Sequence, residues 1–258
     1  MTTVTVDRSG DVTTLTIDAP PVNLYSLALH ADFDGALDLV EADLPRVLVI
    51  RANGKLVSGG VDVAQFHART SVEETKDLYD RMLELPERIN ALRIPTVFVA
   101  HGLTLTWALE VALACDIILA SSKAKFGLVE RVIGLTPTMG GTQRIAACAG
   151  VARAKEIVFT GDLFSAADFE RWNIINRVLD PATLDADVDA FVQQIAVGPT
   201  KAFGAAKDIL DLYEVGGVPV AVAGTTQIAA ALYETQDLRH GMESFLENGP
   251  GQATFTGS

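Results

Sequence analysis

The chain has 258 residues, of which 49% are hydrophobic, and a formal net charge of −13 at pH 7. This length suits one large domain with a full core, and the acidic balance excludes a nucleic-acid-binding protein, which needs a basic stripe to hold phosphates. No run of about 18 uninterrupted apolar residues occurs, so we expect no membrane span and assign the apolar excess to contacts between subunits.

The first 120 residues alternate between strand-like and helix-like patterns. Residues 4–6 and 12–17 alternate apolar and polar side chains around Ser9-Gly10-Asp11, which predicts a hairpin. Helices are expected over residues 26–40 and 71–92 and up to residue 114, and strands over residues 47–50, 97–100 and 117–120. The second helix begins with Ser71-Val72-Glu73-Glu74, a capping-box signature. This alternation predicts parallel crossovers and an α/β layered fold.

From residue 182 onward only helical patterns occur. They cover residues 184–196, 200–213, 219–233 and 237–246, and Gly216-Gly217 predicts a hinge between the second and the third. The small, polar tail over residues 249–258 is expected to be frayed. The N-terminus is strand-like and lacks the basic-then-apolar layout of a signal peptide, so we expect a cytoplasmic protein.

Two glutamates, Glu110 and Glu130, stand 20 residues apart, and each follows a turn. Two carboxylates near one substrate atom can divide the labour, one acting as general base and the other as general acid. By spacing alone the pair is weak evidence for a site, because the chain holds 33 acidic residues and most such pairs are solvated surface.

Three segments carry a resemblance that favours the catalytic interpretation. They read RVLVIRANGKLVSGGVDVAQF over residues 46–66, AHGLTLTWALEVALACDIILA over residues 100–120 and FGLVERVIGLTPTMGGTQR over residues 126–144. In order and spacing the chain resembles the enoyl-CoA hydratase/isomerase (crotonase) superfamily. The resemblance implies a crotonase-like spiral of ββα units over residues 1–195. It also implies a C-terminal helical region over residues 196–258 that assembles a homotrimer or a dimer of trimers.

The resemblance also implies a set of site residues. Backbone N–H groups of Val61 and Trp107 would form an oxyanion hole for an enolate. Glu110 would orient or deprotonate water, and Glu130 would protonate the α-carbon. Residues expected to bind substrate are Gly60, Val61, Asp62, Val63, Ala64 and Trp107. Asp62 could instead cap the following turn. No His/Cys/Asp cluster has metal-ligand spacing, so we expect no metal. The resemblance implies no cofactor besides the coenzyme A of an acyl-CoA substrate.

The sequence departs from the family pattern at two places. Thr106, Trp107 and Ala108 replace three glycines before the first glutamate, so the Trp107 indole could fill part of the acyl pocket or turn into the core. The basic residues that often follow the family's first motif and its C-terminal Phe are missing, which leaves lysines 55, 123 and 125 as candidate phosphate partners.

These observations predict a lyase that adds water across a conjugated acyl-CoA double bond. One alternative is a diverged crotonase that isomerises or hydrolyses another carbonyl substrate through an enolate. The other is a catalytically silent trimeric binding protein, which the Trp107 replacement and the missing cations would favour.

Overall fold

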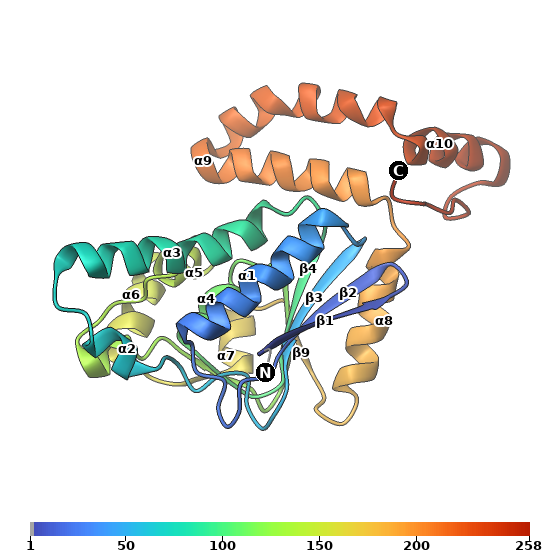
Figure 1. Cartoon of the computed structure of the whole chain (residues 1–258). Coiled ribbons are helices and arrows are strands. Elements are labelled where there is room, and N and C mark those ends of the chain that lie inside the picture. The colour runs from blue at the N-terminus through green and yellow to red at the C-terminus, as the bar shows by residue number, and fades with distance from the viewer. Residues whose placement is uncertain (1–2) are drawn as a thin grey trace.

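A six-stranded sheet forms the centre of the computed structural model, which describes residues 3–258 (Figure 1). The strand order is β1-β2-β3-β4-β6-β9, with β1 antiparallel to β2 and every other neighbouring pair parallel. The strands are β1 (Val4–Ser9), β2 (Val12–Ile17), β3 (Val47–Ala52), β4 (Thr96–Ala100), β6 (Ile117–Ser121) and β9 (Arg177–Leu179). The predicted hairpin and parallel crossovers are confirmed.

Helices cover both faces of this sheet, which explains the continuous apolar runs of its strands. Val47 and Val49 of β3 pack with α8 (Leu184–Ala196) on one face. Leu48 and Ile50 point the other way, into the larger core formed with α1 (Leu27–Ala42) and α3 (Val72–Ala91). Figure 1 shows α8 on the opposite side of the sheet from α1 and α3.

The capping box predicted at the start of α3 is only half formed. The Ser71 hydroxyl accepts a hydrogen bond from the Glu74 N–H, as expected. The Glu74 carboxylate, however, accepts from the N–H and the hydroxyl of Thr70 and not from the Ser71 N–H. The helix therefore begins where the sequence predicts, but the Glu74 carboxylate binds Thr70, the residue before the N-cap, instead of Ser71.

Short elements between the longer ones form a second layer, of which the sequence patterns reveal only the helix α4. A three-stranded sheet has the order β5-β7-β8, with β5 parallel to β7 and β7 antiparallel to β8. The short elements are α2 (Val63–His67), β5 (Leu103–Leu105), α4 (Trp107–Ala112), β7 (Lys125–Gly127), η1 (Glu130–Ile133), α5 (Gly141–Ala149), α6 (Val151–Thr160), β8 (Phe164–Ser165) and α7 (Ala166–Arg171).

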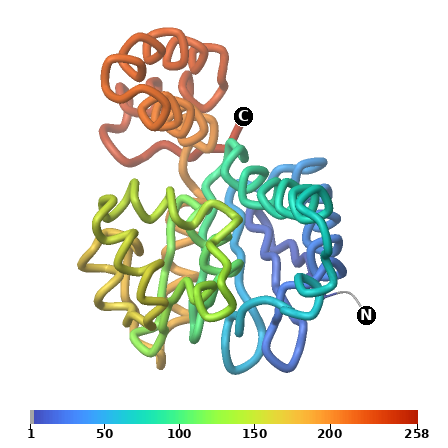
Figure 2. Tube along the Cα trace, turned by 90° about the vertical axis from the view of Figure 1, so that its left-hand side faces the viewer, coloured from blue at the N-terminus to red at the C-terminus, as the bar shows by residue number. Residues whose placement is uncertain are grey.

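The C-terminal helices stand apart from the sheet. Helix α9 (Thr200–Ala231) is broken at Gly216 and Gly217, where φ is −148° and 69°, so that its two arms lie side by side (Figures 1 and 2). The predicted hinge is thus confirmed. By length and mean hydropathy the segment Thr200–Glu234 could span a membrane, a feature that a count of uninterrupted apolar residues misses. Such a match is weak evidence for a span, and the break folds the segment back on itself.

After η2 (Leu232–Glu234) and α10 (Gln236–Asn248) the tail returns to the body of the protein. The buried Asp237 carboxylate accepts hydrogen bonds from the N–H groups of Thr256 and Gly257, each at 2.8 Å. The Arg46 guanidinium donates to the Phe255 carbonyl, also at 2.8 Å. The expectation of a frayed tail is therefore wrong, because buried polar partners far away in sequence hold it.

Candidate active site

A cavity of about 160 Å³ lies where the short elements α2, α4 and η1 meet the long helix α3. The predicted site residues that line it are Gly60, Val61, Val63, Trp107, Glu110 and Glu130. The two glutamates are the only charged residues among the described residues that line this cavity. The structure thus brings together two carboxylates that the sequence separates by 20 positions.

Glu110 lies on α4 and is almost fully buried, with 2% of its surface exposed. Its Oε1 atom accepts hydrogen bonds from the N–H groups of Met139 at 2.8 Å and Gly141 at 2.9 Å. Burial raises the pKa of Glu110, while these N–H groups at the start of α5 act in the opposite direction. The carboxylate is therefore held in one orientation at a helix N-terminus, where negative charge is favoured.

Glu130 begins the short 3-10 turn η1 and has a different environment. Its Oε2 atom is buried and has no hydrogen-bond partner among the described residues. Burial, followed by repulsion from Glu110, raises the pKa of Glu130 to about 7, against the effect of its own backbone N–H. A carboxyl group with this pKa can release and take up a proton near neutral pH.

Two backbone N–H groups at the cavity remain free for a ligand. The carbonyl of Gly60 and the N–H of Asp62 both bond to the backbone of Tyr25, at 2.9 and 3.0 Å, which fixes the residues on either side of Val61. The N–H of Trp107 is the first of α4 and has no intrahelical partner. Neither Val61 nor Trp107 donates its N–H to an acceptor within residues 3–258.

The side chain of Trp107 turns into the core. The residue is fully buried, and its ring centroid lies 6.0 Å from that of Tyr25. The indole N–H donates to the hydroxyl of Ser58 at 2.7 Å. Of the two orientations that the sequence left open, the structure therefore has the core orientation, although the residue also borders the cavity.

Two residues predicted to bind substrate do not line the cavity. Asp62 is the N-cap of α2, and its carboxylate accepts from the Ala64 N–H and the Gln65 side-chain amide, both at 3.1 Å. Ala64 is exposed. The capping interpretation of Asp62 is confirmed. The candidate phosphate partners, lysines 55, 123 and 125, are exposed and also lie outside the cavity lining.

Sequence reasoning missed the residues that support the carboxylates. The N–H groups of Met139 and Gly141 hold Glu110, and a Cβ at Gly141 would lie only 2.8 Å from the Glu110 Cγ. The sequence holds a signal for this, because the Gly140-Gly141 pair forms the N-cap and first residue of α5, and helix N-termini bind anions. Thr106, which has φ of 48°, and Ser58 were also missed as contributors to the site.

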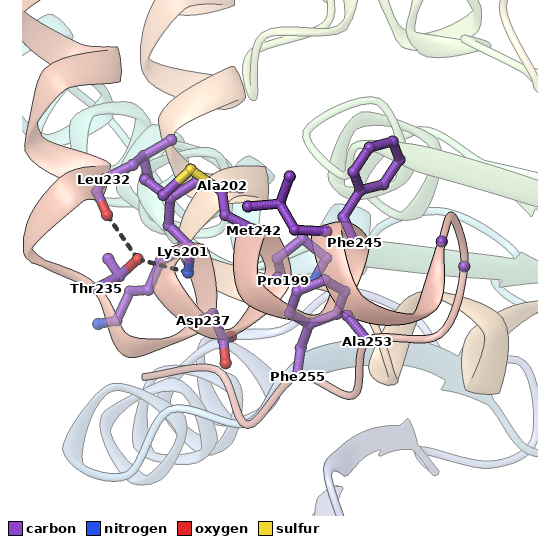
Figure 3. A pocket seen from close by; sticks show the side chains of 15 residues that line it. Pro199, Lys201, Ala202, Leu232, Thr235, Asp237, Met242, Phe245, Ala253 and Phe255 are labelled. Carbon is purple, nitrogen blue, oxygen red and sulfur yellow. Dashed lines mark hydrogen bonds between the residues drawn. The ribbon is translucent and has the colours of Figure 1, made fainter.

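A larger cavity lies elsewhere, but no pair of carboxylates among the described residues lines it. It measures about 560 Å³ and lies among the start of α9, α10 and the tail, as Figure 3 shows. Lys201 and Asp237 are its only charged lining residues in the described chain, and Asp237 is already bonded to the tail. No group of three or more His, Cys, Asp or Glu side chains within residues 3–258 could hold a metal ion.

Comparison with known proteins gives a consistent result. The model of the family described as enoyl-CoA hydratase/isomerase matches residues 7–257. A short-chain-enoyl-CoA hydratase of Clostridium acetobutylicum is 26% identical over 95% of this chain and 94% of its own length. An enoyl-CoA isomerase/hydratase of Mycosarcoma maydis is 32% identical over 83% of this chain and 77% of its own.

Solved structures agree with these matches. The crystal structure of an enoyl-CoA hydratase from Mycobacterium smegmatis is 26% identical, with a TM-score of 0.89 over 95% of this chain and 96% of that chain. The C-terminal helices fall within the region that the family model matches. From its first strand to its tail, the chain belongs to the enoyl-CoA hydratase/isomerase family.

Proposed function

We propose that this enzyme adds water across the conjugated double bond of an enoyl-CoA thioester. The observation that carries the proposal is the pair of carboxylates, Glu110 and Glu130, on one small cavity beside two unpaired backbone N–H groups. Family members of this kind act without a resident cofactor, and coenzyme A is part of the substrate. The cytoplasmic location expected from the sequence belongs to the same proposal.

In the proposed reaction Glu110 takes a proton from water as the water oxygen bonds to the β-carbon. The electron pair of the double bond moves toward the thioester carbonyl, whose oxygen becomes an enolate. The N–H groups of Val61 and Trp107 stabilise that charge, an effect worth about 10²–10³ in rate per donor in other enzymes. Glu130 then delivers its proton to the α-carbon, which completes a 3-hydroxyacyl thioester. Exchange with solvent returns both carboxyl groups to their starting states.

We further propose that the acyl chain is short. The cavity volume of about 160 Å³ is small, and its apolar wall includes Phe66, Met82, Ile133 and Leu135. Such a wall suits a short hydrocarbon group. The name of the Clostridium acetobutylicum relative, a short-chain-enoyl-CoA hydratase, supports the same choice.

The region over residues 196–258 is proposed to hold subunits together as a homotrimer or a dimer of trimers. Large apolar side chains are exposed along α9 and α10: Leu210, Tyr213, Val215, Val218, Val222, Phe245 and Leu246. Exposed apolar surface of this extent marks a contact site. Light scattering at micromolar concentration tests the assembly, and a stable monomer would contradict it.

A second candidate function rests on the absence of basic side chains among the described residues that line the cavity. A diverged family member that acts on a carbonyl compound without coenzyme A would need no phosphate partners, and the net charge of −13 repels an anionic coenzyme. The curated relatives are named enoyl-CoA hydratases, which argues against a catalytically silent binding protein. The loss of enoyl absorbance in the ultraviolet, followed with crotonyl-CoA, tests the first proposal. No loss with any short enoyl-CoA would favour the alternatives.

A further inference from the structure

The two free N–H groups come from different parts of the chain that meet at Ser58. Ser58 and Thr104 form a parallel bridge, in which the Ser58 carbonyl accepts from the Leu105 N–H at 3.3 Å. This backbone pairing ends there, before either Val61 or Trp107 is reached. The separation of the two N–H groups is therefore not set by main-chain hydrogen bonds between their own turns.

A side-chain contact links the turns beyond that point. The Trp107 indole N–H donates to the Ser58 Oγ at 2.7 Å, and the Gly60 N–H donates to the same atom at 3.0 Å. The Ser58 hydroxyl donates in turn to the Asn23 carbonyl at 2.8 Å. Trp107 and Ser58 are both fully buried. One hydroxyl thus ties the side chain of Trp107 to the residue directly before Val61.

The backbone before Trp107 adds a second observation. Thr106 has φ of 48° and ψ of −119°, a conformation that residues other than glycine rarely adopt. Such a conformation persists only where the surroundings determine it. On one side the Thr106 N–H is held by the Gly127 carbonyl at 3.0 Å. On the other side the hydrogen bond of the indole to Ser58 holds Trp107, so the backbone is fixed both before and after the strained Thr106.

We propose that Trp107 is a positioning residue, whose indole bond to Ser58 sets the spacing of the Val61 and Trp107 N–H groups around the substrate oxygen. The proposal rests on the proposed function, because this spacing matters only if a carbonyl oxygen lies between the two groups. Glycines at residues 106–108 could not make this link, since they have no side chain.

The first test replaces Trp107 by Phe, which retains an aromatic ring but removes the N–H donor. We expect kcat for crotonyl-CoA hydration to fall about 10-fold while KM stays within about twofold, because oxyanion contacts strengthen in the transition state. Trp172→Phe is the matched control, since this tryptophan packs against Phe164 and Phe169 and does not line the cavity. It should retain full activity. Equal losses of kcat in the two variants would overturn the proposal.

Ser58→Ala removes the acceptor of the same bond and provides a second route if Trp107→Phe folds poorly. We expect a loss in kcat of similar size, and the double variant should be little worse than either single variant, because both remove one interaction. Losses that simply multiply would show that the two residues act independently, which contradicts the proposal.

Acetoacetyl-CoA separates this proposal from the proposed function, because its bound enolate is visible in the ultraviolet without any turnover. The wild-type protein should increase the enolate fraction on binding, and both single variants should do so less while binding butyryl-CoA equally well. If the wild-type protein neither hydrates crotonyl-CoA nor stabilises the enolate, the proposed function fails, and the positioning role fails with it. If the wild-type protein does both and the variants match it, only the positioning role fails.

Discussion

The two carboxylates of the proposed active site lie in opposite environments. Glu110, on α4, is nearly inaccessible, and two N–H groups at the start of α5 bond to one of its oxygens. Glu130, at the start of η1, is less buried, and one of its oxygens has no partner within residues 3–258. Burial raises the pKa of both groups. The N–H groups of Met139 and Gly141 oppose this rise at Glu110, whereas at Glu130 only its own backbone N–H opposes it, and repulsion from Glu110 adds to it. In the proposed mechanism, this difference in environment is what assigns the base role to one glutamate and the acid role to the other.

Replacing Glu130 by Gln should have the largest effect. The amide retains the shape of the side chain but cannot deliver a proton, so we expect the hydration rate to fall by about 10²–10⁴. Steady-state kinetics with crotonyl-CoA measures the loss, and circular dichroism checks that the fold is intact. Full activity in this variant would assign the proton transfer to another group. It would then contradict the proposal that Glu110 acts as the base and Glu130 as the acid.

Gly141→Ala should displace the Glu110 carboxylate without replacing either glutamate. The new Cβ would lie 2.8 Å from the Glu110 Cγ and 3.1 Å from its Oε1, so the carboxylate must move. We expect kcat/KM to fall about 10- to 100-fold, because small misplacements of reacting groups are costly. Gly35→Ala is the matched control, since its Cβ would meet no atom within 4 Å. Equal activity of the two variants would show that the orientation of Glu110 is unimportant.

The pH dependence of the hydration rate should follow the protonation of Glu130. Its pKa of about 7 means that the protonated form, which the proposed hydration needs, is lost as the pH rises through that value. The hydration rate should therefore fall roughly tenfold for each pH unit well above 7. The residual activity of Glu130→Gln should lack this descending limb. A wild-type rate that stays constant from pH 6 to pH 9 would contradict the assignment of Glu130 as the acid.

The smallest expected effect is on stability. The folded state retains the Glu130 proton over a pH range, about 4.5 to 7, in which the unfolded chain has already lost it. Stability is therefore lost as the pH rises through this window, because the folded state binds more protons. Glu130→Gln should be more stable than the wild type at pH 8, by about 2–3 kcal/mol, slightly below the full conversion of the pKa difference because part of the side chain is exposed, and the difference should vanish near pH 4.5. Urea unfolding of both proteins at pH 8 and near pH 4.5 measures this difference in the free energy of unfolding. The same difference at both pH values would contradict the raised pKa of Glu130.

Much of the fold could be predicted from the sequence, because its strands and helices are marked by patterns within short segments. The strands around residues 47–50 and 97–100 are continuous apolar runs, and the hinge at Gly216-Gly217 is explicit in composition. Both glutamates were found through motif spacing. The strands β5, β7 and β8 were missed, since two or three residues are too few to show a period.

The remaining features depend on contacts between residues far apart in the chain. The bond between Trp107 and Ser58 joins positions 49 residues apart, and the short helix α4 shows too little periodicity to indicate where the indole points. The tail was expected to be frayed because its own composition is polar. The buried carboxylate of Asp237 and the guanidinium of Arg46, which hold it, lie elsewhere in the sequence.

The most direct test of the central claim is to incubate the wild-type protein with crotonyl-CoA in ¹⁸O-labelled water and to analyse the product by mass spectrometry. Hydration by Glu110 and Glu130 predicts 3-hydroxybutyryl-CoA with one labelled oxygen at the β-carbon and an intact thioester. Label in a free carboxylic acid, together with released coenzyme A, would instead indicate hydrolysis. Unchanged crotonyl-CoA would show that the two carboxylates do not perform this reaction.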